Sequence, residues 1–286
     1  MTATVDEAYR VCESITRDQA RNFFYGIRLL RPAKRNALCA LYALSRRIDD
    51  IGDGDLAVDE KVRQLADVRT SLAQIDTTTD PVLIAVADAA KRFPVPMGAF
   101  TELVDGVEMD VSGRHYETFD ELVTYCRCVA GSVGRLCLGV FGSKPDPLAG
   151  QYADELGIAL QQTNILRDIR EDLMNGRVYL PQSDLDRFGV KLELDPNGAL
   201  ADPEGHLAEL IEDAAIRARG WYDRGLRLMP LLDRRSAACT GAMSGIYRRL
   251  LKRIAAEPTA VYDKRLSLSG REKAGVALRA LVGAEI

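Results

Sequence analysis

The sequence predicts an all-α protein: a single-domain bundle of helices around a central apolar cavity. Apolar residues recur with helical spacing from one end of the 286-residue chain to the other. Alternating β-branched runs bounded by turn residues, which would indicate strands, are nearly absent. No Ser/Gly-rich linker and no abrupt change of composition divides the chain, so residues 1–286 are expected to form one domain.

We expect about ten helices. They occupy residues 5–18, 32–52, 58–74, 80–92, 96–110, 118–142, 148–175, 203–233, 236–256 and 270–283. Thr118 followed by Glu121 forms a capping box, and Pro32 and Pro81 each suit a first helical turn. Prolines and glycines between residues 179 and 205 mark a long irregular connection, which is either a lid or a surface loop.

Composition excludes several classes of function. The 38 basic and 42 acidic residues give a net charge of −4, so no nucleic-acid partner is expected. Two histidines leave little material for a zinc site or a Ser-His-Asp relay. The six cysteines lack CxxC spacing and lie mostly in apolar helical patterns, which predicts buried, reduced thiols.

The sequence also predicts a cytoplasmic location. The first ten residues carry acids and no apolar core, unlike a secretory signal. The most apolar stretch, residues 129–142, is interrupted by Arg135 and is shorter than the roughly 20 residues that a membrane-spanning helix needs. An apolar tunnel mouth would still allow weak peripheral contact with the inner face of the membrane.

A first acidic motif follows a buried helix. Residues 38–45 are apolar around nearly the full helical circumference, and the character then changes abruptly. Asp49, Asp50 and Asp53 fall within one turn, which makes a compact trio of oxygen ligands. Taken alone, such a trio is more often a solvated helix end.

A second motif repeats this design more than a hundred residues later. Asn164, Asp168 and Asp172 are spaced four residues apart and so line one helical stripe, while Glu171 points partly aside. Facing carboxylates repel one another unless cations lie between them, and Mg²⁺, with Mn²⁺ as a substitute, prefers oxygen ligands. Neutralising Asp168 is therefore expected to relieve repulsion in the metal-free protein.

These charges predict chemistry on a diphosphate. Metals and arginines absorb the negative charge that builds up as the carbon–oxygen bond breaks. The allylic cation left behind needs an apolar tunnel that excludes water. Val129, Ala130, Gly131 and Gly134 are candidates to line this cavity, although close contact between helices explains the glycines almost as well.

Three segments resemble the squalene and phytoene synthase family. Residues 20–53 (ARNFFYGIRLLRPAKRNALCALYALSRRIDDIGD) look like its first signature, and residues 125–134 (YCRCVAGSVG) look like its central glycine segment. Residues 162–172 (QTNILRDIRED) with 176–181 (GRVYLP) are similar to its second aspartate signature. In order and spacing the resemblance extends from about residue 8 to 280.

The resemblance implies roles for individual residues. Magnesium would be held by Asp49, Asp50, Asp53, Asn164, Asp168 and Asp172. The diphosphates would be held by Arg21, Arg46, Arg167 and Arg265. Tyr42 and Tyr247 would face the reacting carbons and, with Asp49, Asp53, Asp168 and Asp172, form the catalytic set. Two departures stand out: Ala20-Arg21-Asn22 replaces Ser-Arg-Ser, and Arg127 replaces the second tyrosine of Tyr-Cys-Tyr.

Within this family the sequence looks most like the bacterial presqualene diphosphate synthases of hopanoid pathways, which join two farnesyl diphosphates head to head. Phytoene synthase, which acts on geranylgeranyl diphosphate in carotenoid synthesis, and one-enzyme squalene or dehydrosqualene synthase remain alternatives. A helical scaffold without turnover is a further alternative. NADPH is not expected, because the nearest match to a dinucleotide loop, residues 52–57, follows a helix and is acidic. Expected partners are isoprenoid diphosphates and downstream enzymes of the pathway.

Overall fold

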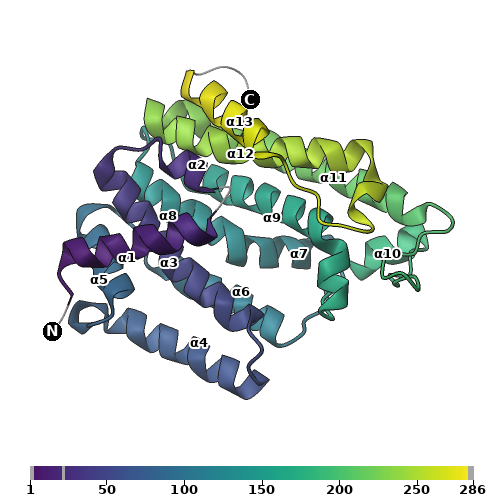
Figure 1. The fold of residues 1–286 in the computed structure, drawn as a ribbon, viewed down its shortest axis with the longest axis horizontal. Coiled ribbons are helices and arrows are strands. Elements are labelled where there is room, and N and C mark those ends of the chain that lie inside the picture. Colours follow the sequence, from purple (N-terminus) through teal and green to yellow (C-terminus); the bar gives the residue numbers. More distant parts are fainter. Residues whose placement is uncertain (1–2, 21–22, 283–286) are drawn as a thin grey trace.

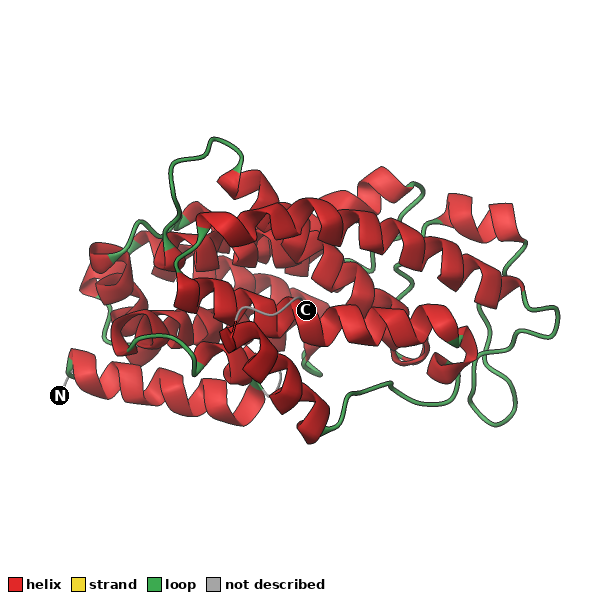
Figure 2. Ribbon diagram, turned by 90° about the horizontal axis from the view of Figure 1, so that it is seen from above, coloured by secondary structure: helices red, strands yellow, loops and turns green. Residues whose placement is uncertain are grey.

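The computed structural model describes residues 3–20 and 23–282, and these fold into a bundle of helices (Figure 1). The helices are α1 (Val5–Gln19), α2 (Phe23–Ile27), α3 (Pro32–Asp53), α4 (Val58–Ala73), α5 (Pro81–Arg92), α6 (Gly98–Val111), α7 (Phe119–Cys126), α8 (Ser132–Phe141), α9 (Ala149–Met174), α10 (Gln182–Phe188), α11 (His206–Gly225), α12 (Arg234–Ala256) and α13 (Gly270–Val282). Figure 2 shows helices joined by loops. Apart from a single bridge between Leu194 and Leu200, these residues contain no β-structure, which confirms the predicted fold class.

The helices begin where local chemistry favours a start. At α7 the Thr118 side chain accepts a hydrogen bond from the Glu121 backbone, and the Glu121 side chain accepts one from the Thr118 backbone, which confirms the predicted capping box. Pro81 occupies the first position of α5, where Asp80 caps the helix. These contacts satisfy N–H groups that have no partner within the helix.

The described residues form three more α-helices than the ten predicted, for two reasons. The five residues of α2 and the seven of α10 are too few to show a helical period. The helix predicted over residues 118–142 is divided into α7 and α8 by a π turn, Arg127–Gly131. The remaining nine predicted ranges each match one observed α-helix, and eight of them have ends that differ by only a few residues. The ninth, 203–233, runs past the end of α11 at Gly225 through a 3₁₀ helix, Leu226–Leu231.

Two hydrophobic clusters form the core. One gathers buried side chains from α1, α3, α5, α6 and α8, and the other gathers them from α7, α9, α11 and α12. Val129, on the π turn, packs against both clusters. α3, which carries the first acidic motif, packs in the first cluster, whereas α9, which carries the second, begins in the first cluster and continues into the other (Figure 1).

The glycines of the central segment serve close packing between helices. A Cβ on Gly134 would lie 2.4 Å from the Ala153 carbonyl oxygen of α9, and one on Gly131 would lie 2.9 Å from Asp154 Oδ1. From the other side, a Cβ on Gly157 would lie 2.4 Å from the Ala130 carbonyl oxygen. At Gly131 and Gly134 the structure favours the packing alternative over the prediction that they line the cavity.

The connection from Tyr179 to Gly205 is tied to the body of the protein. The Arg170 side chain donates a hydrogen bond to the Gly198 carbonyl oxygen (2.6 Å), and the Tyr262 hydroxyl donates one to Asp202 (2.5 Å).

Among the helices that the structure describes, none is long and apolar enough to cross a membrane. All six cysteines are free thiols; four are buried and two partly buried.

Candidate active site

The first acidic motif lies on the last turns of α3. Asp49 is half-buried there, whereas Asp50 and Asp53 are exposed. Burial, followed by repulsion from Asp53 and Asp50, raises the pKa of Asp49 to about 7, although the Arg46 guanidinium opposes the shift. Arg46 forms an ion pair with Asp50, with 2.6 Å between Nη2 and Oδ1. Arg46, which was predicted to hold diphosphate, thus lies beside this motif.

The second motif lies on the last three turns of α9. Asp168 receives hydrogen bonds from its neighbour Arg167 (2.7 Å, from Nε) and from Arg265 (2.8 Å, from Nε, and 3.0 Å, from Nη2). Burial and the Asp168 charge raise the pKa of Asp172 to about 7. The Asn164 carbonyl oxygen Oδ1 is buried and has no hydrogen-bond partner in the described part of the chain.

Asp110 connects the two motifs, and the sequence analysis did not single it out. It lies on the last turn of α6, where it adds to the repulsion that raises the pKa of both Asp49 and Asp172. It accepts hydrogen bonds from the Tyr179 hydroxyl (2.7 Å) and the Tyr125 hydroxyl (3.0 Å). The sequence pattern that could have identified Asp110 is the one seen in the two motifs, an apolar helix that ends in acidic residues.

Arg177 is a second residue to which no role was assigned, although it lies inside the quoted 176–181 segment. Its Nη1 is 2.8 Å from Asp53 Oδ1, and its Nη2 donates to the Gly52 carbonyl oxygen at 3.0 Å. It therefore links the chain just after α9 to the end of α3. Burial disfavours its charge, but Asp53 outweighs this effect and raises the pKa of Arg177.

An aromatic group lies beside the charged residues. The Phe23 ring of α2 is 6.2 Å, centroid to centroid, from Tyr42 of α3 and also 6.2 Å from Tyr247 of α12. Burial disfavours the charge of Arg167, but the Asp168 carboxylate and the Tyr247 hydroxyl outweigh it, so the pKa of Arg167 is raised. Tyr42 and Tyr247 thus both lie beside Phe23, and their role toward the reacting carbons stays a prediction. Arg21 lies outside the described residues.

The six predicted metal ligands suit a magnesium ion in their chemistry. All offer hard oxygen donors, and Asn164 Oδ1 is an unused acceptor. As arranged, no three His, Cys, Asp or Glu side chains of residues 3–20 and 23–282 could hold a metal ion together. Instead, arginines neutralise several of the carboxylates, including Asp50, Asp53 and Asp168.

The chain is similar to known proteins over nearly its whole length. The phytoene synthase of Mycobacterium tuberculosis is 58% identical over 277 residues, covering 97% of this chain and 91% of that protein. The 15-cis-phytoene synthase of Synechocystis is 34% identical over 284 residues, covering 92% and 81%. A crystal structure of a dehydrosqualene synthase matches with a TM-score of 0.82 and 26% identity, covering 98% of this chain and 97% of that one.

The family model described as squalene/phytoene synthase matches residues 16–272, which include both acidic motifs, Asp110 and Arg177. Members of this family are magnesium-dependent prenyltransferases that act on isoprenoid diphosphates. The match covers most of the chain, and the two acidic motifs lie beside the arginines that were predicted to hold diphosphate. The chain therefore belongs to the squalene/phytoene synthase family and is a prenyltransferase.

Proposed function

We propose that this protein is a phytoene synthase, which joins two geranylgeranyl diphosphates head to head. The observation that carries the proposal is the 58% identity to the phytoene synthase of Mycobacterium tuberculosis over 97% of this chain. This favours the phytoene synthase alternative over the presqualene diphosphate synthase that the motifs first indicated. The motifs contain the residues that bind diphosphate. Identity along the whole chain also includes the residues that determine how long an isoprenoid substrate can bind.

The arginines of the site are suited to hold the leaving diphosphate. Arg46, Arg167 and Arg265 offer forked donors, and each already forms an ion pair with a carboxylate of one of the two motifs. The aspartates would hold Mg²⁺, which would supply positive charge to the leaving diphosphate. We assign Asp49, Asp53, Asp168 and Asp172 to metal binding, with Asp50 and Asn164 as further ligands.

Phe23, Tyr42 and Tyr247 are suited to the carbon side of the reaction. Their ring faces are electron-rich and stabilise a nearby cation, while their bulk excludes water. The allylic carbon–oxygen bond breaks first, and the double bond of the second substrate then attacks the cation. Loss of two diphosphates and two protons leaves a hydrocarbon with no net electron change, so the reaction needs no NADPH.

The purified protein with Mg²⁺ and either the C15 or the C20 diphosphate tests this assignment. We expect the C20 substrate to be consumed faster and to give phytoene, identified by mass spectrometry and absorbance. Consumption of C15 alone, stopping at a cyclopropyl diphosphate, would return the assignment to presqualene diphosphate synthase. A C30 product that forms only with NADPH would identify a one-enzyme squalene synthase.

Dehydrosqualene synthase is the second candidate, because the crystal structure of such an enzyme shares the fold with a TM-score of 0.82. The same experiment separates it from phytoene synthase. Dehydrosqualene would form from the C15 substrate without NADPH, whereas phytoene requires the C20 substrate. The proposed weak contact with a membrane surface fits all these products, which are long hydrocarbons.

A further inference from the structure

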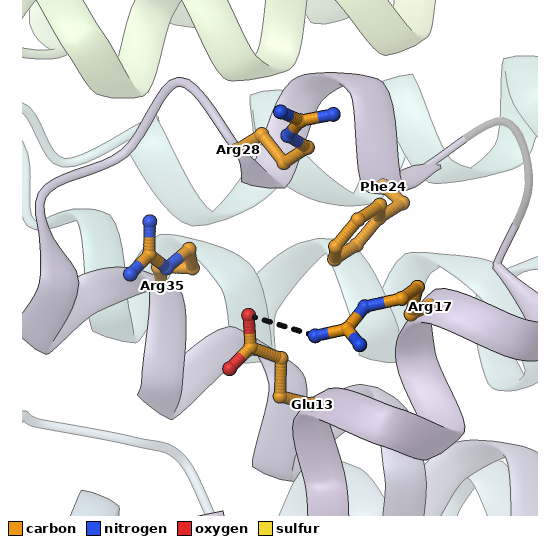
Figure 3. A pocket seen from close by; sticks show the side chains of 5 residues that line it. All are labelled: Glu13, Arg17, Phe24, Arg28 and Arg35. Carbon is orange, nitrogen blue, oxygen red and sulfur yellow. Dashed lines mark ion pairs between the residues drawn. The ribbon is translucent and has the colours of Figure 1, made fainter. Parts of the chain in front are cut away.

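A basic hollow opens on the surface formed by α1, α2, α3 and α13. It consists of two adjoining parts, of about 530 Å³ and about 340 Å³, which share Arg17, Phe24 and Arg28. Glu13 and Arg35 complete the first part (Figure 3). Tyr25, Gly270 and Lys273 complete the second. We call these eight residues the arginine groove.

The arginine groove is separate from the candidate active site. Phe23 turns its ring toward Tyr42 and Tyr247, whereas the next residue, Phe24, lines the groove, so α2 lies between the two sites. Arg35 precedes Asp49 by fourteen residues on α3, which corresponds to about 21 Å along the helix axis. None of the predicted catalytic, metal-binding or diphosphate-binding residues lines the groove in the described part of the chain.

The groove carries an excess of positive charge. Arg17, Arg28, Arg35 and Lys273 contribute four cations, and Glu13 contributes the single carboxylate. Glu13 is 3.5 Å from Arg17, the ion pair drawn in Figure 3. With only one acid to neutralise four bases, the groove attracts anions.

Two of these arginines form no ion pair with an acid of the described residues. Within the described residues, Arg28 and Arg35 have no carboxylate partner. The Arg28 guanidinium instead lies 6.0 Å from the centre of the Phe24 ring, which holds it at the groove wall. Arg35 Nε is buried without a hydrogen-bond acceptor, an unfavourable state that an anionic ligand would relieve.

We propose that the arginine groove binds a phosphate group, at a site distinct from the catalytic one. Guanidinium forks match phosphate oxygens, and three of them line one hollow. Two sources share this chemistry: a free diphosphate and the headgroup of an anionic phospholipid. The lipid source is included because Tyr25, a large side chain of the groove itself, is 36% exposed and could contact the apolar part of a lipid. No residue assigned to catalysis lines the groove, so phosphate binding there does not depend on the proposed function.

Paired variants test the groove in the full-length protein. Arg28→Gln/Arg35→Gln removes the two arginines without carboxylate partners, and Arg219→Gln/Arg227→Gln removes the same charge from exposed positions elsewhere. Binding of inorganic diphosphate is measured by calorimetry in chelator. Binding to vesicles of phosphatidylglycerol, against phosphatidylcholine, is measured by sedimentation. We expect the groove variant to lose about tenfold in affinity for one of these probes and the control less than twofold.

The two measurements also identify the source of the phosphate. Loss of one diphosphate-binding component, with turnover unchanged, indicates a free diphosphate. Loss of binding to phosphatidylglycerol alone indicates a lipid headgroup. If the groove variant and the control bind both probes equally well, the proposal is overturned.

Glu13→Gln is the complementary variant, and it carries the test if the double variant fails to fold. Removing the one carboxylate frees Arg17 and leaves four cations facing the ligand. We expect affinity for the responding probe to rise about threefold, a gain that a merely structural role of Glu13 would not produce. An unchanged or weaker affinity would count against the groove.

Discussion

Asp49 on α3 and Asp172 on α9 both hold protons more tightly in the folded protein than in the unfolded chain. Burial and neighbouring acids raise each pKa from 3.8 to about 7. Between about pH 4 and pH 7 the folded protein therefore retains protons that the unfolded chain has lost. Stability of the metal-free protein must decline as the pH rises through this window.

Asp49→Asn should remove part of this pH dependence. In chelator above pH 7 we expect the variant to be more stable than the parent by about 2 kcal/mol, less than the full shift implies because neighbouring acids share the relief. Below about pH 4 the two should be equal. Urea denaturation across pH measures this, with Asp223→Asn, an exposed position on α11, as the control. A constant difference at all pH values would contradict the assignment.

Asp168 behaves differently, and here the structure corrects an expectation from the sequence. Its carboxylate is not simply repelled by other acids, because Arg167, which is buried, and Arg265, which is exposed, both donate hydrogen bonds to it. Neutralising it should therefore lower the stability of the metal-free protein rather than raise it, since removing one partner leaves Arg167 buried and unpaired.

Asp168→Asn should also cut the rate by the roughly 10²–10³-fold typical of losing one charge-stabilising group. Glu171→Gln on the same turn is the matched control, because within the described residues the only ion pair of Glu171 is a 3.8 Å contact with Arg170. We expect it to cost much less. Steady-state kinetics and melting curves in chelator give both readouts. Full activity in Asp168→Asn would show that the second motif is structural.

At the scale of elements, α3 and α9 carry the two motifs, and Arg177 fastens the chain that follows α9 to the end of α3. Its hydrogen bonds to Asp53 and to the Gly52 carbonyl connect residue 177 to the last turn of α3. Arg177→Gln should release residues 176–181. We expect faster amide hydrogen exchange there, measured by mass spectrometry, and a higher KM for the diphosphate. Arg187→Gln, which breaks an ion pair between α10 and α11, is the control.

Close packing of α8 on α9 depends on glycine. Gly134→Ala places a methyl group 2.4 Å from the Ala153 carbonyl oxygen, and backbone cannot move aside as a side chain can. We expect a loss of about 1–3 kcal/mol in the free energy of unfolding. Gly150→Ala, in the first turn of α9 with nothing within 4 Å of the new methyl, should be neutral or stabilising by up to about 1 kcal/mol. Equal effects at both positions would refute close packing as the reason for Gly134.

At the scale of the whole molecule, the cluster of acids and arginines predicts coupled binding of metal and diphosphate. Each alone meets like charge: Mg²⁺ meets the arginines, and diphosphate meets the aspartates. Together they complement the site. We expect Mg²⁺ plus diphosphate to raise Tm by more than the sum of the two separate shifts, and Asp168→Asn to abolish the excess. Additive shifts in the parent protein would contradict a shared site.

The sequence by itself determined the helices and the chemistry carried by single helices. Apolar spacing of three and four residues reflects the helical turn, so α3 and α9 could be placed within a few residues. The same geometry aligned Asn164, Asp168 and Asp172. Arg46 lies one helical turn before its partner Asp50, and Arg167 is adjacent to Asp168. These relations are local, and local relations can be read from spacing.

Only the tertiary structure decided how the helices meet. Asp110 and Arg177 join the site through partners that are 15 to 125 residues away, and no spacing rule connects such positions. From the sequence, the central glycines could equally line a cavity or allow two helices to pack closely. The position of Ala153 beside Gly134 in the structure favours close packing. The arginine groove gathers side chains from four helices. Contacts between helices depend on crossing angles that the packing of the whole core sets, and a periodic pattern along one chain carries no record of them.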